Sequence, residues 1–335
     1  MALSESGRYL ESLTDFDKVI ELAPNDAGNH LHRGIVRSCL GDTLGALEDF
    51  EKMIELEPED KEGWYDRGLE RQSAGDTEGA LADFDKVITL APDWAEGYHQ
   101  RGLIRAKNND EKGAIDDFGE ELKLHPGASR AFVGLGNIRY EQGDYNYAIW
   151  YFNKAILYDK DCIEAYFMIG ISEIRLEQYK EAIAQFNTVI DMDPDYGMSY
   201  YNRALAKGLS GDLEGAISDY DLTINAGFDE AEVYHNRATL KVITEDYEGA
   251  ITDYRLALEM DPSYFKTYLN RGYLYCLQHD YLSALKDFME AMKIDHKQFK
   301  KEVFQNIEER KASKLSSHLI DATKLMKLAL KSAEA

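Results

Sequence analysis

Small, aromatic and polar residues recur along this chain with a period of 34 positions. In each unit of 34, the fourth place is bulky, the eighth is Gly or Ala, the twentieth is Ala and the twenty-fourth is Phe or Tyr. The small residues let two antiparallel helices approach closely, and the aromatic residues fill the space between adjacent hairpins. Each unit is therefore predicted to be a helix, a turn and a helix. The units are 27–60, 61–94, 95–128, 129–162, 163–196, 197–230, 231–264 and 265–298.

Proline supports the same period, because it neither continues a helix nor donates a backbone hydrogen bond. The chain has six prolines, and every interval between them is 34 residues or twice 34. Four Gly-Asp pairs fall between the two predicted helices of a unit, where Gly can end the first helix and Asp can cap the second. They begin at Gly41, Gly75, Gly143 and Gly211.

The order of aromatic, small residue, Ala, aromatic and Pro within 34 residues resembles the tetratricopeptide repeat. The resemblance covers residues 5–298 and implies an all-α fold, a right-handed superhelical solenoid of antiparallel helix hairpins. We expect an incomplete first repeat over 5–26, which has the second helix only, and eight complete repeats over 27–298. Residues 299–335 are expected to form capping helices that close the last repeat.

Both ends of the array differ from its centre. Either a longer protein, from which this chain is cut, supplies the missing first helix, or residues 5–26 cap the array alone. In the final stretch, apolar residues at helical spacing predict the capping helices. They are Val303, Phe304, Ile307, Leu315, Leu319, Ala322, Met326 and Leu330.

Composition narrows the classes of partner. The formal net charge of -24 disfavours binding to nucleic acid, and we expect no membrane insertion because no apolar run is long enough to span a bilayer. Cys39, Cys162 and Cys276 are far apart and odd in number, which argues against a disulfide framework and a zinc site. The start of the chain has no secretory signal pattern, so we expect a cytoplasmic location.

The seventh and twenty-third places of the units change together. Six units carry Arg and Asp there, and in the other two both charges are absent, leaving Leu135 with Tyr151 and Ile169 with Gln185. Because the match holds within each unit, we predict a salt bridge between the two helices of one hairpin, and a structural role is favoured over a ligand contact. The predicted pairs are Arg33–Asp49, Arg67–Asp83, Arg101–Asp117, Arg203–Asp219, Arg237–Asp253 and Arg271–Asp287.

The resemblance implies that the first helix of each repeat lines a concave groove. Amides at the sixth place resemble the ladder with which some family members hold a peptide backbone, although Asn is also the common residue there. The apolar residues could equally pack between repeats or bind a partner's side chains or helix. The predicted partner-binding residues are Phe167, Met168, Ile171, Ile174, Met198, Tyr201, Asn202, Leu205, Leu209, Asn236 and Asn270.

Other sites known in the family or in enzymes find little support. A clamp for a chaperone's C-terminal carboxylate needs several basic residues, and Arg130 with Asn137 is only a fragment of one. The glycine-rich segments lack the Lys of a phosphate loop, and the histidines and carboxylates lack metal-ligand spacing. We therefore expect no catalytic residue, metal or cofactor, and do not expect an enzyme.

The resemblance implies an adaptor or scaffold for protein–protein interaction, which binds a peptide or helix of a partner in the concave groove. Two alternatives stay open. The chain could be a structural scaffold that self-assembles into a homo-oligomer, or it could be the recognition arm of a larger enzyme from which it is cut.

Overall fold

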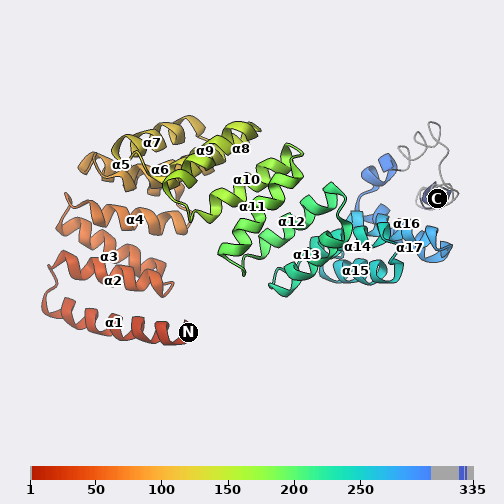
Figure 1. Cartoon of the computed structure of the whole chain (residues 1–335). Coiled ribbons are helices and arrows are strands. Elements are labelled where there is room, and N and C mark those ends of the chain that lie inside the picture. Colours follow the sequence, from red (N-terminus) through yellow and green to blue (C-terminus); the bar gives the residue numbers. More distant parts are fainter. Residues whose placement is uncertain (1, 303–323, 328, 330–335) are drawn as a thin grey trace. The chain divides into compact units, whose positions relative to one another are not determined.

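The computed structural model describes residues 2–302, 324–327 and 329 (Figure 1). Within these residues every regular element is a helix, and consecutive helices pair, which confirms the predicted all-α fold of helix hairpins. The chain divides into two compact units, Met1–Met168 and Ile169–Ala335, which are described separately. Helix α10 (Ile163–Arg175) contains the division.

The first unit begins with one helix, α1 (Ala2–Leu22), which contacts α2. Four hairpins follow, and in each a helix of 13 residues pairs with one of 14. They are α2 (Ala27–Cys39) with α3 (Thr43–Leu56), α4 (Lys61–Ser73) with α5 (Thr77–Leu90), α6 (Ala95–Lys107) with α7 (Glu111–Leu124), and α8 (Ser129–Glu141) with α9 (Tyr145–Tyr158).

The second unit continues the same arrangement. Helix α11 (Tyr179–Met192) packs against α12, and three hairpins follow. They are α12 (Gly197–Ser210) with α13 (Leu213–Asn225), α14 (Ala231–Ile243) with α15 (Tyr247–Met260), and α16 (Phe265–Leu277) with α17 (Tyr281–Ile294). Residues 296–302 are again helical.

The turn between the helices of a hairpin follows the predicted capping. Gly41 has φ +79°, in the left-handed region that an L side chain adopts only with strain. Asp42 then accepts a hydrogen bond from the backbone N–H of Gly45, in the first turn of α3. The other three Gly-Asp pairs do the same, so this prediction is confirmed.

The eighth and twenty-fourth places form the closest contact of each hairpin. A Cβ on Gly34 would lie 2.6 Å from the ring of Phe50, which is 1% exposed. Where the ring is Tyr, as in Tyr220 and Tyr254, the eighth place is Ala instead of Gly. The close approach of the two helices therefore depends on a small residue beneath each buried ring.

The fourth-place aromatic residue is fixed by its polar end. Trp64 Nε1 donates to the carbonyl of Pro58 at 3.0 Å, and Tyr98 and Tyr200 donate in the same way to the proline six residues earlier. The ring thus packs between hairpins while its N–H or O–H satisfies the loop before the helix.

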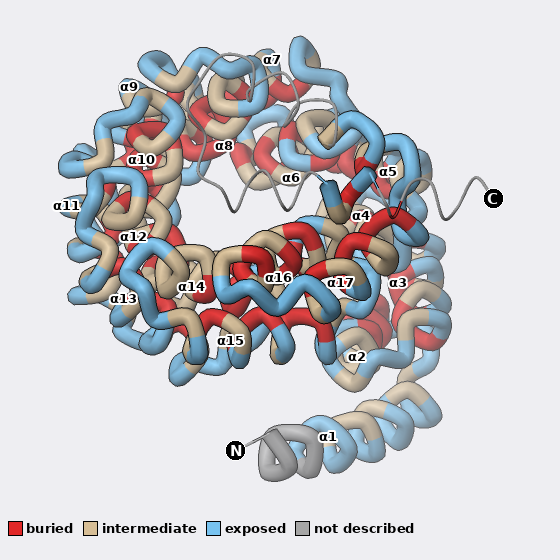
Figure 2. The backbone as a smooth tube through the Cα atoms, turned by 90° about the vertical axis from the view of Figure 1, so that its right-hand side faces the viewer, coloured by how far each residue is buried: buried red, intermediate tan, exposed pale blue. Residues whose placement is uncertain are grey.

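The two ends of the chain are covered differently. Figure 2 shows α1 without a buried residue among residues 8–22. At the other end, Phe299, Met326 and Ala329 are buried in one cluster with Phe288 of α17. Of the predicted capping residues, Val303, Phe304, Ile307, Leu315, Leu319, Ala322 and Leu330 lie outside the described residues.

Candidate binding surface on the first helices

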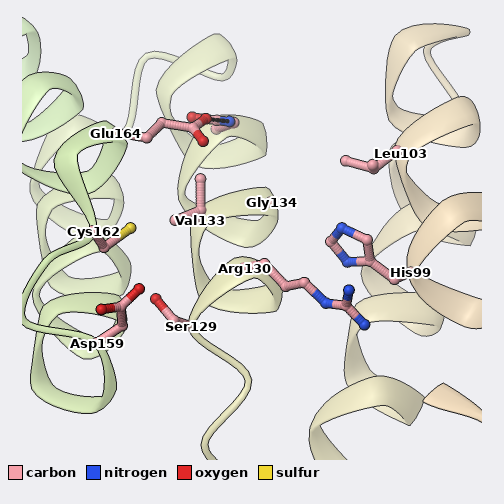
Figure 3. Close-up of a pocket in the computed structure, with 10 residues that line it drawn as sticks. His99, Leu103, Ser129, Arg130, Val133, Gly134, Asp159, Cys162 and Glu164 are labelled. Atoms are coloured by element: carbon pink, nitrogen blue, oxygen red, sulfur yellow. Dashed lines mark hydrogen bonds between the residues drawn. The ribbon is translucent and has the colours of Figure 1, made fainter. Parts of the chain in front are cut away.

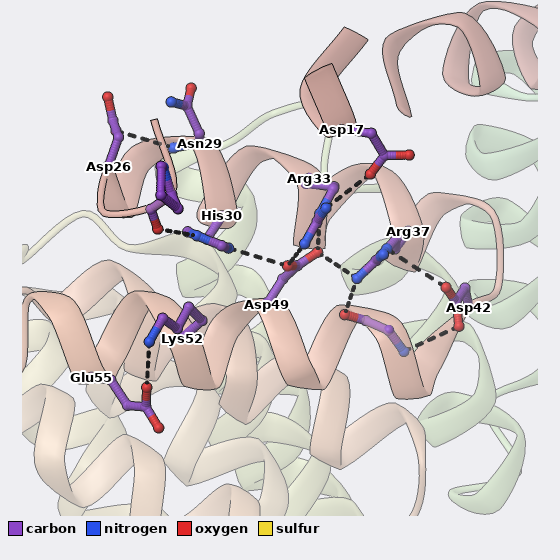
Figure 4. A network of polar contacts seen from close by, with 12 residues as sticks. Asp17, Asp26, Asn29, His30, Arg33, Arg37, Asp42, Asp49, Lys52 and Glu55 are labelled. Atoms are coloured by element: carbon purple, nitrogen blue, oxygen red, sulfur yellow. Dashed lines mark hydrogen bonds and ion pairs between the residues drawn. The ribbon is translucent and has the colours of Figure 1, made fainter. Parts of the chain in front are cut away.

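The structure brings together each predicted Arg–Asp pair between the two helices of one hairpin. In the first hairpin, Arg33 Nε lies 2.9 Å from Asp49 Oδ2, and Arg33 Nη2 lies 2.6 Å from Oδ1 (Figure 4). Asp49 is only 2% exposed, so this is a largely buried, bidentate pair. The corresponding pairs are Arg67–Asp83, Arg101–Asp117, Arg203–Asp219, Arg237–Asp253 and Arg271–Asp287.

A second cation at the eleventh place completes most of these pairs, and sequence reasoning missed it. Arg37 Nη1 donates to Asp49 Oδ2 at 2.8 Å, so that two guanidinium groups hold one carboxylate (Figure 4). In the second unit Lys207 and Lys241 take the same role at 2.8 and 2.9 Å. The signal was visible, because basic residues recur at this place in the same units. These arginines and lysines are occupied inside the hairpins.

The predicted groove residues are divided between the two units. Phe167 and Met168 are half-buried on the first unit. On the second unit, Leu209 is the most accessible, at 58% exposed. Tyr201 and Asn202 are buried there, and the others are half-buried, namely Ile171, Ile174, Met198, Leu205, Asn236 and Asn270.

The three asparagines of the predicted amide ladder hydrogen-bond within the second unit. Asn202 Nδ2 donates to the carbonyl of Met198, in its own helix, at 2.8 Å. Asn236 Nδ2 donates to the hydroxyl of Tyr201 at 3.1 Å, and Asn270 bonds to a buried tyrosine of α15. A peptide backbone would have to compete with these bonds, and contact between the ladder and a ligand stays a prediction.

A cavity of about 260 Å³ opens on the first unit, among α6, α8 and the start of α10 (Figure 3). It lies beside the sixth place of the unit 129–162, which is Gly134, where every other unit carries a side chain. A Cβ on Gly134 would lie 2.6 Å from the ring of Phe118, so this place is kept bare by packing from behind. His99, Arg130, Asn137, Asp159, Cys162 and Glu164 supply the polar groups of the lining.

Arg130 is held at the cavity by two carboxylates. Its Nε donates to Glu121 at 2.7 Å, and its Nη2 lies 2.5 Å from Glu96. Burial opposes its charge, but these two bonds raise the pKa of the guanidinium above its ordinary value. Glu121 is fully buried and also lies 2.7 Å from His99 Nδ1. The charge of Arg130 is thus already balanced, which makes this arginine a poor anchor for a ligand carboxylate.

Comparison with protein families decides the nature of the repeats. Models of the tetratricopeptide repeat match residues 99–161 and 167–229, and a further one matches 242–279. The chain is a tetratricopeptide-repeat protein. No curated protein matches its sequence.

Solved tetratricopeptide-repeat structures share the fold. A repeat protein from Parabacteroides merdae is 19% identical, with a TM-score of 0.56, over 70% of this chain and 93% of that one. The Pseudomonas aeruginosa protein pilF is 17% identical, with a TM-score of 0.54, over 60% and 92%. In the APC/C hetero-tetramer Cut9-Hcn1, a chain is 14% identical, with a TM-score of 0.56, over 94% and 58%. At these identities the likeness shows the fold alone.

One tetratricopeptide repeat reverses the charge pattern of its hairpin. In the unit 163–196, the eleventh place is Glu173, which is 7% exposed and has one carboxylate oxygen without a hydrogen-bond partner in the described residues. Burial raises the pKa of Glu173 to about 7, and the nearby charge of Glu181 adds to the effect, whereas a hydrogen bond with Gln185 opposes it.

Two searches of the described residues add no further site to the tetratricopeptide-repeat surface. No helix in that part of the chain is long and apolar enough to cross a membrane. No group of three or more His, Cys, Asp and Glu residues there is arranged to hold a metal ion.

Proposed function

We propose that this chain is an interaction scaffold that binds an extended segment of a partner protein along the first helices of its repeats. The tetratricopeptide fold is generally that of a protein-interaction module. The single observation that carries the finer proposal is the cavity at Gly134, because it is large enough for one side chain and lies on first helices only. We propose no catalytic role and no cofactor.

The second unit supports the proposal with accessible apolar side chains. Leu209 on α12 and Ile243 on α14 are each 58% exposed, although both belong to first helices of repeats. Apolar side chains on this face would contact alternate residues of an extended peptide or one face of a helix. We further propose a cytoplasmic location, supported by three free cysteines, of which Cys39 is exposed.

The test is an array of overlapping or random decapeptides, probed with the full chain and with single variants. Leu103→Asp alters the wall of the cavity and Leu209→Asp alters the second unit, and both side chains are exposed, so folding should persist. Leu44→Asp, on the second helix α3 and 78% exposed, is the matched control. We expect the first two variants to weaken peptide binding about tenfold or more and the control to leave it unchanged. Equal binding by all three variants would refute the proposal.

A second candidate, self-assembly through second helices, rests on α9. This helix has no carboxylate, in a chain with 62 of them, and exposes Tyr147, Trp150 and Leu157 at 58%, 50% and 64%. Exposed aromatic residues on one helix are typical of an interaction surface. Mass measurement over a concentration series tests it, since a dimer that Trp150→Ser dissolves would favour this candidate, and a monomer at all concentrations would exclude it.

A further inference from the structure

The charges around the cavity at Gly134 select the kind of side chain that can enter it. Four carboxylates lie on or next to the lining, and they belong to Glu96, Glu121, Asp159 and Glu164. Arg130 and His99 are on the same wall, and both are already bound to Glu121. Figure 3 shows Arg130 reaching toward His99, with Asp159 and Glu164 across from them. The lining therefore carries an excess of negative charge.

The remaining polar groups of the lining also lack donors to satisfy them. Asn137 Nδ2 donates to Glu164 Oε1 at 3.3 Å, whereas Asn137 Oδ1 is buried without a hydrogen-bond partner in the described residues. A small rotation of this amide would offer its oxygen to a donor in the cavity. A ligand that brings hydrogen-bond donors and positive charge would satisfy both this oxygen and the carboxylate of Glu164.

From this cavity we infer that the scaffold takes a Lys or Arg side chain of its partner between α6, α8 and the start of α10. The inference rests on the proposed function and specifies the chemistry of the partner segment. The methylene stem would pack on Leu103 and Val133, which also line the cavity, and the cationic end would face Glu164 and Asp159. An acidic side chain would meet these two carboxylates, since Arg130 is already paired.

The experiment uses the full chain and a library of labelled random decapeptides, followed by fluorescence polarisation on the strongest binders. In these, each Lys or Arg is replaced in turn by norleucine or citrulline, which keep the stem or shape and remove the charge. We expect binders to be enriched in Lys and Arg, and one replacement to weaken binding about tenfold, as loss of a charged hydrogen bond would. Affinity should also fall as salt is raised.

The double variant Glu164→Gln/Asp159→Asn connects this preference to the cavity. It should bind the cationic decapeptide about tenfold more weakly and bind the norleucine version as well as the unaltered chain does. Glu62→Gln is the matched control, because Glu62 is an exposed carboxylate at the same place of another repeat as Glu164, outside the cavity. It should change neither affinity.

Two kinds of result would overturn the inference, and they differ in what they leave standing. Enrichment of acidic decapeptides, or equal binding of the Lys and norleucine versions, would overturn the cation preference and leave the proposed function intact. No binding by any decapeptide, with folded protein verified by circular dichroism, would overturn both.

Discussion

Replacing Glu173 by Gln should stabilise the second unit at neutral and alkaline pH. The carboxyl group is 7% exposed and occupies the place at which other repeats hold a cation against a buried Asp. Here the twenty-third place is Gln185 and the nearby charge is that of Glu181, so no cation offsets ionisation of Glu173. Glutamine keeps the shape and hydrogen-bonding capacity of the side chain and removes the charge.

The size and direction of the effect follow from the pKa of Glu173, which rises from 4.5 to about 7 on folding. The folded state holds this proton more tightly than the unfolded state, so the stability that the group contributes is fully present below about pH 4.5 and is lost as the pH rises to about 7. One pKa unit corresponds to about 1.4 kcal/mol, which sets an upper limit of about 3 kcal/mol, and partial access of water reduces this to about 2.

The assay is the difference in unfolding free energy between Glu173→Gln and the unaltered chain, measured with urea from pH 4.5 to 8.5. Because repeats can unfold separately, hydrogen exchange in α10 and α11 should accompany the global measurement. The difference should be near zero at the acid end and reach about 2 kcal/mol above pH 7.5. Glu181→Gln, an exposed control, should show a much smaller change. A difference that does not vary with pH would refute this reasoning.

Three further predictions test the hairpins themselves. Removing either partner of the buried Arg237–Asp253 pair should cost about 3–5 kcal/mol, and a double-mutant cycle should show strong coupling between the two. Gly134→Ala should lower the unfolding free energy by about 1–3 kcal/mol, because its methyl group would meet a buried ring, whereas Gly119→Ala has open space and should gain about 0.5–1 in thermal or urea unfolding. Glu245→Gly should raise the melting temperature, because this residue has φ +64° in the turn where other repeats have Gly.

The architecture was predictable because each structural requirement appears in nearly every repeat. The eighth place, for example, is small in all eight complete units, and comparison of units within one chain made its role visible. The predicted pairing of Arg with Asp inside a hairpin used the same comparison. The second cation, such as Arg37, was also present in the pattern, but its contact depends on the direction of the side chain as well as on its place.

The candidate cavity was not predictable, because it depends on single departures from the repeat. Glu121, Arg130 and His99 occupy three different places in two consecutive units, so no periodic signal connects them. Their contact requires the packing of α6, α7 and α8. The direction of an amide, as in Asn202, is likewise set by local bonds that spacing does not reveal.

These departures are more informative about binding than the conserved period is, because they are costly to maintain. Glu121 is a fully buried carboxylate at a place where Val87 and Val189 fill the same position in other repeats. A buried ion pair seldom stabilises a fold more than well-packed apolar residues of similar volume do, so hairpin stability alone gives no reason for Glu121. Its partners Arg130 and His99 stand at the edge of the cavity, where a fixed arrangement of charges can discriminate between ligands. The repeat therefore accounts for the scaffold, and its exceptions around Gly134 account best for selectivity.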